Sequence, residues 1–265
     1  MKLLVQSDDY GITKAAAAGV IEGIRNGIIR NTGVFTNMPW AAECIEWIYP
    51  YLDQIAFGID LNASTGSSLL GYEKVPSLCH EDGSFLTSRE NRALDTDEND
   101  HDHVIYEDVY AEFEAQIKRF IELTGRVPDY FHAHAYTTKT TVKAISDLAE
   151  KYHRVYITGY MEKLGAPYAK MSWVKMGEPS VQVQSDLKSY ILNDEAGFLK
   201  KDLGYLVTHC GYVDEEIMRL SSFNLVRMKD LDALTSQEVI SWIKENDIRL
   251  ITIKDLIREQ ENESA

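Results

Sequence analysis

Short apolar runs alternate with amphipathic segments along most of this chain. Each run is bounded by polar or turn-forming residues, which is typical of buried strands in an α/β protein. The runs that predict strands are 2–6, 31–37, 55–62, 130–135, 155–158, 204–208 and 249–253, with a further strand expected around 181–184.

Helical spacing and capping residues predict helices between these runs. Thr13 is placed to cap a helix that ends near Asn26. Within 104–123, apolar residues recur every four positions, which places them on one helix face. Residues 235–238 form a capping box that begins a helix ending near 246. Further helices are expected over 41–52, 140–151 and the charged C-terminal tail.

The alternation of about seven strands with helices favours a (β/α) barrel over an open dinucleotide-binding sheet. A glycine-rich phosphate-binding motif after the first strand is also lacking. The chain has no internal repeat or Pro/Gly/Ser-rich linker, so we expect residues 1–265 to form a single catalytic barrel domain. Residues 64–103 break the alternation and predict a long loop insertion, a kind of segment that is usually functional in compact domains.

Composition narrows the class of function. The 27 Lys+Arg and 42 Asp+Glu residues give a formal charge of −15, which argues against binding to nucleic acid or to anionic lipid. No apolar run reaches the roughly 18–20 residues of a membrane helix, and no leader is evident, so we expect a cytoplasmic protein. The cysteines Cys44, Cys79 and Cys210 are too few for a disulfide framework and predict free thiols. A neutral or cationic small molecule is the expected substrate.

Polar clusters follow the carboxyl ends of several predicted strands, where barrel enzymes build their active sites. The cluster residues are Asp8, Asp9, Asp60, His132, His134 and His209. The two aspartates in sequence repel each other unless a metal ion or a proton neutralises them, although an aspartate pair can also serve as a loop cap. Because several clusters coincide at this edge, we interpret them together as a catalytic site.

His132 and His134 have the spacing of a metal site. Residues i and i+2 on a strand point to the same face, so both imidazoles project together. A pair of hydrogen-bonded core histidines is the alternative. Asp60 lies in the apolar stretch Gly58-Ile59-Asp60-Leu61, where a lone carboxylate is costly unless it is paired or bound to a metal.

These motifs carry a resemblance to a known family. The matching segments, in order, are Ser7-Asp8-Asp9-Tyr10-Gly11, Asn37-Met38-Pro39, Gly58-Ile59-Asp60-Leu61 and His209-Cys210-Gly211-Tyr212. The chain resembles the YdjC-like carbohydrate deacetylases, chitooligosaccharide deacetylases that share a distorted barrel with the NodB-type polysaccharide deacetylases. The resemblance implies a hydrolase that removes an acetyl group from an N-acetylated sugar.

Two positions depart from the family pattern. The family usually has His where this chain has Asp60, and it has Asp-Ser-His where this chain has His132-Ala133-His134. His134 therefore falls on the family's metal-binding His, and His132 falls on the preceding Asp. The ligand set implied by the resemblance is Asp9, Asp60 and His134, around one divalent ion that is magnesium, manganese or zinc.

The resemblance also implies catalytic roles. Asp8 is expected to act as the general base, and His209 is expected to protonate the departing amine. Tyr10, Asn37, His132 and Tyr212 are expected to contact a small carbohydrate substrate. A phosphorylated sugar would require a cationic pocket, for which Lys170, Lys175 and Arg227 are candidates.

Two alternatives remain open from the sequence. Two carboxylates and one imidazole also suit another metal-dependent sugar-processing enzyme on the same barrel. A non-catalytic carbohydrate-binding relative is the second alternative. The expected partner is the small substrate, with a homo-oligomer also possible.

Overall fold

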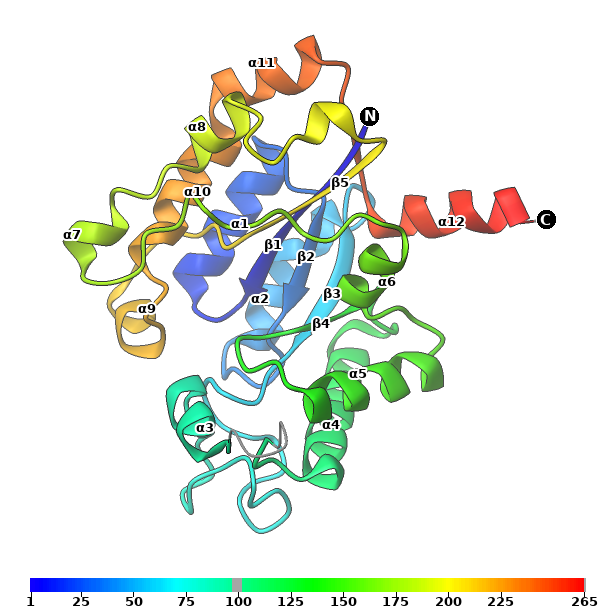
Figure 1. Ribbon diagram of the computed structural model, residues 1–265. Helices are drawn as coiled ribbons and strands as arrows, with labels where there is room; N and C mark the ends of the chain where they lie inside the picture. The colour runs from blue at the N-terminus through cyan, green and yellow to red at the C-terminus, as the bar shows by residue number, and fades with distance from the viewer. Residues whose placement is uncertain (97–101, 265) are drawn as a thin grey trace.

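A parallel sheet runs through the centre of the molecule. The computed structural model describes residues 1–96 and 102–264, so part of the predicted loop insertion, 97–101, lies outside the described residues. The strands lie in the order β4-β3-β2-β1-β5, and β6 also pairs with β1 (Figure 1). Their bounds are β1 Lys2–Tyr10, β2 Asn31–Val34, β3 Ala56–Leu61, β4 Phe131–Ala133, β5 Leu203–Thr208 and β6 Arg249–Ile251.

Strand β1 is the centre of the sheet. It pairs with β5 along Lys2–Ser7, while its other edge pairs first with β6 and then, from Gln6 onward, with β2. Every residue of β1 after Lys2 is buried. A strand that is covered on both faces is expected to contain a continuous apolar run, and Leu3-Leu4-Val5 is such a run. The burial extends to Asp8 and Asp9, which therefore lie within the strand and not beyond it.

Helices cover both faces of the sheet. Thr13 caps α1 as predicted, since its side chain accepts a hydrogen bond from the amide of Ala16 at 3.1 Å. Ser236 caps α11 in the same way. The helices are α1 Lys14–Arg25, α2 Ala41–Ile48, α3 Ser88–Leu94, α4 Tyr106–Thr124, α5 Lys139–Lys151, α6 Ile157–Lys163, α7 Pro179–Gln182, α8 Leu187–Leu192, α9 Glu215–Leu220, α10 Leu225–Thr235, α11 Gln237–Glu245 and α12 Ile253–Ser264, with short 3-10 turns at Tyr49–Tyr51 and Phe198–Lys200.

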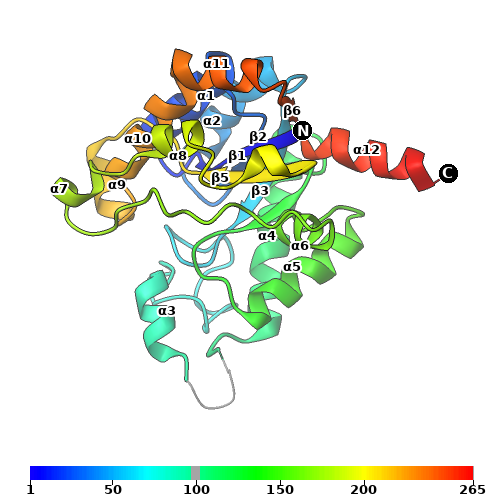
Figure 2. The same cartoon turned by 45° about the horizontal axis from the view of Figure 1, so that its top comes forward.

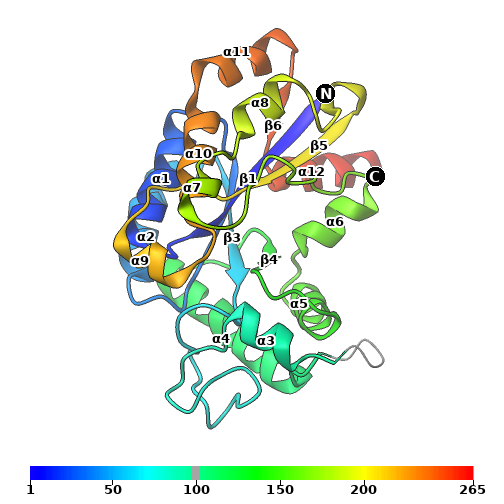
Figure 3. The same cartoon turned by 60° about the vertical axis from the view of Figure 1, so that its left-hand side comes forward.

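The two faces of the sheet pack against different cores. Leu3 and Val5 face a large core that includes residues of α1, α2, α4 and α10. Leu4 faces a smaller core, which contains Tyr130 and Tyr205 and is closed by residues of α6 and α12. Figures 2 and 3 show α1, α2 and α10 on one side of the sheet and α6 and α12 on the other. By strand parity, Gln6 and Asp8 lie on the smaller-core side with Leu4.

The sheet corrects part of the predicted fold. The α/β class is confirmed, but the described chain contains a sheet of six strands instead of about seven, and within it no pairing joins β4 to β5 to close a barrel. The expected strand 155–158 is reduced to a single bridge between Phe131 and Tyr156, because α6 begins at the next residue. The expected strand 181–184 is not formed: Val181 and Gln182 belong to the short helix α7, where Pro179 at the first turn favours a helix start, and Val183 caps that helix.

The inserted segment after β3 is held to helix α4 and within itself by buried polar contacts. Glu112 of α4 is fully buried and accepts hydrogen bonds from the Ser68 hydroxyl at 2.7 Å and the Leu69 amide at 3.1 Å. Asn91 of α3 is also buried and donates to the Leu86 carbonyl at 2.8 Å. None of the helices in residues 1–96 and 102–264 has the length and apolar character needed to cross a membrane.

Packing on the smaller-core face requires two glycines. Gly33 and Gly58 are register partners on β2 and β3. A Cβ on Gly58 would lie 2.6–2.7 Å from ring atoms of the buried Tyr130, and one on Gly33 would lie 1.9 Å from the Asp60 carboxylate. The two glycines therefore provide the space in which these large and charged side chains are buried.

We predict that Gly58→Ala lowers the free energy of unfolding by about 1–3 kcal/mol, since the added methyl overpacks a core that cannot move freely. Urea unfolding measures this loss. Gly159→Ala is the control, because its Cβ would meet only the edge of Tyr156 at 3.2 Å and alanine favours a helix. Equal stability of the unmutated protein and Gly58→Ala would contradict this close packing against Tyr130.

Candidate functional site

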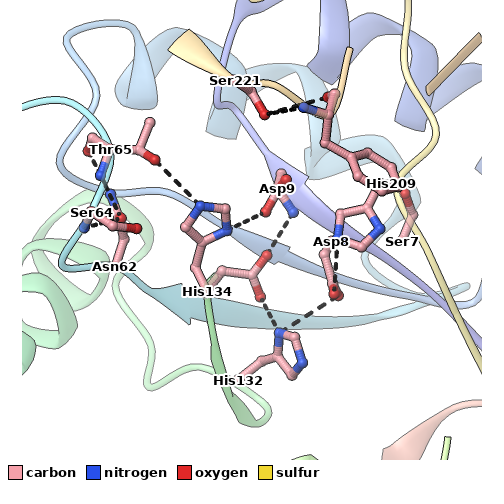
Figure 4. Close-up of polar contacts among 12 residues, drawn as sticks. Ser7, Asp8, Asp9, Asn62, Ser64, Thr65, His132, His134, His209 and Ser221 are labelled. Carbon is pink, nitrogen blue, oxygen red and sulfur yellow. Dashed lines mark hydrogen bonds and ion pairs between the residues drawn. The ribbon is translucent and has the colours of Figure 1, made fainter. Parts of the chain in front are cut away.

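Charged side chains converge at the carboxyl edge of the sheet. Asp8, Asp60 and His132 come from β1, β3 and β4, and His209 follows the end of β5. Asp60 and His132 are register partners across β3 and β4, so their side chains lie on the same face. In Figure 4, Asp8 lies between His132 on one side and His209 on the other.

Asp8, Asp60 and His132 form a group that could hold a metal ion. Each offers one ligand atom, and these atoms all lie within 4.8 Å of one another. The Nδ1 atom of His132 lies 3.4 Å from Oδ1 of Asp60 and 3.6 Å from Oδ1 of Asp8. Both Asp60 Oδ1 and His132 Nδ1 are buried without a hydrogen-bond partner among the described residues. Two adjacent polar atoms without a hydrogen bond are costly to bury, and a cation bound by both would offset this cost.

Burial and mutual charge shift the pKa values in this group. Burial raises the pKa of Asp8 to about 8; His132 opposes the shift, whereas the carboxylates of Asp60 and Asp9 add to it. Burial lowers the pKa of His132, but Asp8 and Asp60 outweigh burial and raise that pKa to about 9. The cluster therefore holds protons strongly when it holds no cation, as expected for negative charge concentrated in a buried site.

Asp9 points into a different environment from Asp8. Its backbone has a φ of 66°, in the left-handed region, and the pairing of β1 with β2 shifts register between Ser7 and Tyr10. The Asp9 carboxylate lies 2.7 Å from Nδ1 of His134 and accepts a hydrogen bond from the Arg227 guanidinium at 2.6 Å. Burial alone would raise the pKa of Asp9, but His134 and Arg227 outweigh burial and hold it well below its usual range. Asp9 is therefore an ionised carboxylate whose negative charge is compensated by its partners.

The backbone of Asp9 connects the ion pair of Asp9 with Arg227 to the group formed by Asp8, Asp60 and His132. Its amide donates a hydrogen bond of 2.7 Å to Oδ2 of Asp60, which leaves only Oδ1 of Asp60 without a partner. On the other side, the His134 ring lies 3.3 Å from the hydroxyl of Thr65, at the start of the inserted segment. Asp9 thus links the inserted segment, through His134, to the sheet edge.

His209 lies next to Asp8 on the opposite side from His132. Its Nε2 is 3.8 Å from Oδ2 of Asp8, and its ring packs against Phe223 with centroids 4.7 Å apart. The amide of His209 donates to the buried carboxylate of Asp230 at 3.0 Å. Burial lowers the pKa of His209 to about 4, so the ring is neutral at neutral pH. Its Nδ1 has no hydrogen-bond partner in the described chain.

The structure groups the predicted site residues differently from the expectation. The expected ligands Asp9, Asp60 and His134 are not brought together as one group, because the carboxylate of Asp9 is shared between His134 and Arg227. The group that is brought together has Asp8 and His132 in their place and keeps Asp60. Arg227, a candidate for binding a phosphorylated substrate, is instead buried in the ion pair with Asp9.

The predicted sugar-binding residues also differ in their surroundings. Tyr10 is fully buried, and its hydroxyl donates to the Cys44 carbonyl, so its polar tip faces the core and not the site. Asn37 uses its amide to bind the Thr65 and Ser67 carbonyls and so fixes the inserted segment. Tyr212 is 47% exposed, and its ring is free of the core.

The sequence analysis missed several residues that contact the site, among them Gln6 and Asp230. Gln6 donates a hydrogen bond to Asp8, and the i, i+2 parity used for the two histidines would have placed Gln6 on the Asp8 face. Asp230 accepts hydrogen bonds from the His209 amide and from the Trp173 indole at 3.1 Å. Asp230 lies in helix α10, and no motif in the sequence marks it as a partner of the strand end.

Comparison with known proteins gives the geometry a family context. A family model described as YdjC-like protein matches residues 2–245. A carbohydrate deacetylase from Thermoanaerobacter pseudethanolicus is 28% identical over 94% of this chain and 96% of its own length. A carbohydrate deacetylase from Clostridium beijerinckii is 27% identical over 97% of this chain and all of its own length.

Solved structures share the fold. A crystal structure from Enterococcus faecalis, provisionally named a cellobiose-phosphate cleavage protein, matches with a TM-score of 0.77 and 24% identity over 96% of this chain and 98% of that one. A family 4 acetyl xylan esterase from Clostridium thermocellum matches with a TM-score of 0.51 and 10% identity over 97% and 91%. At these identities the likeness concerns the fold alone.

We predict a pH-dependent effect of Asp230→Asn on stability. Burial raises the pKa of Asp230 to about 7, so its contribution to stability is complete below its unfolded pKa near 3.8 and is lost as the pH rises through about 7. Asparagine cannot ionise, so the variant does not share this loss. The free energy of unfolding of the variant, relative to that of the unmutated protein, should therefore be about 2–3 kcal/mol higher at pH 9 than at pH 5.

Urea unfolding of both proteins at pH 5 and pH 9 measures this gain. Asp232→Asn, at a position exposed on the same helix, is the control and should show the same stability difference at both pH values. If the free energies of unfolding of Asp230→Asn and the unmutated protein differ by the same amount at pH 5 and pH 9, Asp230 stays ionised across this range.

Proposed function

Because the chain belongs to the YdjC-like protein family, we propose that it is a metal-dependent carbohydrate deacetylase that hydrolyses the acetyl amide of an N-acetylated sugar. Its relatives named as carbohydrate deacetylases match it along nearly the full length of both chains. The observation that carries the metal dependence is the pair of buried ligand atoms on Asp60 and His132, which lie 3.4 Å apart without a hydrogen bond, next to Asp8.

In this proposal Asp8, Asp60 and His132 hold one divalent ion. Two carboxylates and one imidazole suit magnesium, manganese or zinc, and three protein ligands leave positions open for water and substrate. When bound, such an ion polarises the acetyl carbonyl and lowers the pKa of water. Asp8 thereby exchanges the expected role of general base for that of a ligand, since its neighbour Asp9 is already neutralised.

His209 is the proposed proton carrier. An imidazole can take a proton from the attacking water and return it to the amine nitrogen as the carbon–nitrogen bond breaks. Hydrolysis then yields acetate and the free amine of the sugar. The position of His209 supports this role: Asp8 separates it from His132, and the hydrogen bond from its amide to Asp230 fixes the strand end.

Asp9, His134 and Arg227 are proposed to support the site without holding the ion. Their ion pair keeps one negative charge compensated beside the cluster, so a divalent cation meets the charge of Asp8 and Asp60 and not that of three carboxylates. Tyr212 is proposed to border the sugar because its ring is exposed next to the His209 strand end.

We predict that metal-depleted protein releases no acetate from N-acetylglucosamine oligosaccharides and that adding Mn²⁺ or Zn²⁺ restores release. His209→Ala should lower kcat by about 10²–10⁴-fold while metal binding is kept, because it removes the proton carrier but no ligand. His132→Ala should lose both metal and activity. Acetate detection and metal titration measure these effects.

His80→Ala is the control, since His80 is an exposed histidine of the inserted segment. Retained acetate release after complete metal removal would contradict the metal dependence. Sugar binding without acetate release at any divalent ion would favour a non-catalytic carbohydrate-binding protein, and turnover of a different bond would favour another sugar-processing enzyme.

We also predict that Asp60 and His132 can exchange places. As register partners on one face, they present either side chain to the same space. His132→Asp alone should weaken zinc binding, because a third carboxylate replaces the imidazole that zinc favours, and adding Asp60→His should recover much of the loss. Titration of each variant with Zn²⁺ and Mn²⁺ tests this. A double variant as weak as the sum of its single losses would show that the two positions are not equivalent.

A further inference from the structure

A buried chain of hydrogen bonds leads from the smaller core to Asp8. The Tyr205 hydroxyl donates to Oε1 of Gln6 at 2.9 Å, and Nε2 of Gln6 donates to Oδ1 of Asp8 at 2.5 Å. Tyr205 and Gln6 are both fully buried. Each link joins a donor to an acceptor, so the chain has one direction, from the phenol to the carboxylate.

The direction of this chain depends on Tyr205. A side-chain amide has a donor end and an acceptor end of nearly equal size, so a buried glutamine can turn either end toward a carboxylate. With the phenol donating to Oε1, only Nε2 is left to face Asp8. With Asp8 ionised, as it must be to bind a metal, the reverse orientation would place Oε1 against the carboxylate without a proton between them, which is unfavourable in a buried site.

The partner of each aspartate differs in charge. Asp9 is held by the cationic Arg227, which cancels its negative charge. Asp8 is held by the neutral amide of Gln6, which orients the carboxylate but leaves its charge available. The same oxygen of Asp8 that Gln6 binds also faces His132 at 3.6 Å. Hydrogen bonds to a ligating carboxylate generally orient it toward the metal.

We propose that Gln6, oriented by Tyr205, is a positioning residue that fixes the Asp8 carboxylate for metal binding. This inference rests on the proposed function, because it requires Asp8 to be a ligand. Gln6 acts through Asp8 and touches neither the metal nor the substrate. Tyr205 acts one step further away, through Gln6.

Metal affinity of three variants tests the inference, with Mn²⁺ and Zn²⁺ alone as probes. Gln6→Met keeps the length of the side chain but removes its donor, and it should weaken binding by about 10–100-fold, the usual effect of losing a partner of a metal ligand. Tyr205→Phe should weaken binding by a smaller factor, because the amide is kept but no longer oriented. The double variant should bind no more weakly than Gln6→Met, since Tyr205 acts only through Gln6.

Tyr160→Phe is the matched control, because it removes a phenol hydroxyl from a ring packed against the same smaller core. It should leave metal affinity unchanged. Thermal unfolding of the metal-free variants checks that they fold. If Gln6→Met does not fold, the more conservative Tyr205→Phe still tests the inference.

The outcomes separate this inference from the proposed function. Tight binding by the unmutated protein with equal binding by both single variants would overturn the role of Gln6 and leave the metal site in place. Losses that add in the double variant would overturn the link from Tyr205 through Gln6. No binding of either ion by the unmutated protein would overturn the metal site and, with it, this inference.

Discussion

The burial of two consecutive carboxylates in one strand is the constraint on which this structure depends. Removing an ion from water costs several kcal/mol even after relaxation, so Asp8 and Asp9 each require compensation. The chain meets this requirement by turning at Asp9, whose φ of 66° directs the two side chains into different surroundings. Aspartate is among the few residues that adopt this backbone conformation readily.

The compensation of the two aspartates comes from distant parts of the sequence. Arg227, on helix α10, and His134, after β4, neutralise Asp9. Asp8 instead lies with Asp60 and His132, in a cluster with unsatisfied ligand atoms. The same turn that separates the aspartates also aims the Asp9 amide at Asp60. One backbone conformation thus stabilises the ion pair and shapes the cluster that we propose as the metal site.

Local patterns predicted the positions of the elements well. The apolar runs marked all six strands, and Thr13 and the residues before Gln237 marked two helix starts, because these signals depend only on neighbouring residues. The carboxyl ends of parallel strands meet at one edge, so the gathering of Asp8, Asp60, His132 and His209 was also predictable. Residues 155–158 and 181–184 were wrongly predicted as strands, because a short apolar run has the same pattern in a strand and in a buried helix.

The grouping within the site was not predictable from local signals. Strand parity places Asp8 and Asp9 on opposite faces, but it does not indicate which of them meets His132, because a bulge and a left-handed residue intervene. The pairing of Asp9 with Arg227 spans most of the chain and leaves no trace in residue spacing. The binding of Asp230 to a backbone amide likewise carries no side-chain signature.

The register pairing of Asp60 with His132 has a consequence for how such chains diverge. The two departures from the family pattern fall on this one pair of facing positions, where Asp and His stand opposite to the usual order. A chain with His at both positions would still offer two imidazoles beside Asp8, which is a common ligand set for zinc. With the proposed metal site, an evolving lineage can therefore pass from one order to the other in two single steps, each of which keeps two carboxylate or imidazole ligands at these positions. In a column-by-column alignment, such a chain differs at two positions of the proposed site, whereas across the sheet the same Asp and His have only exchanged places.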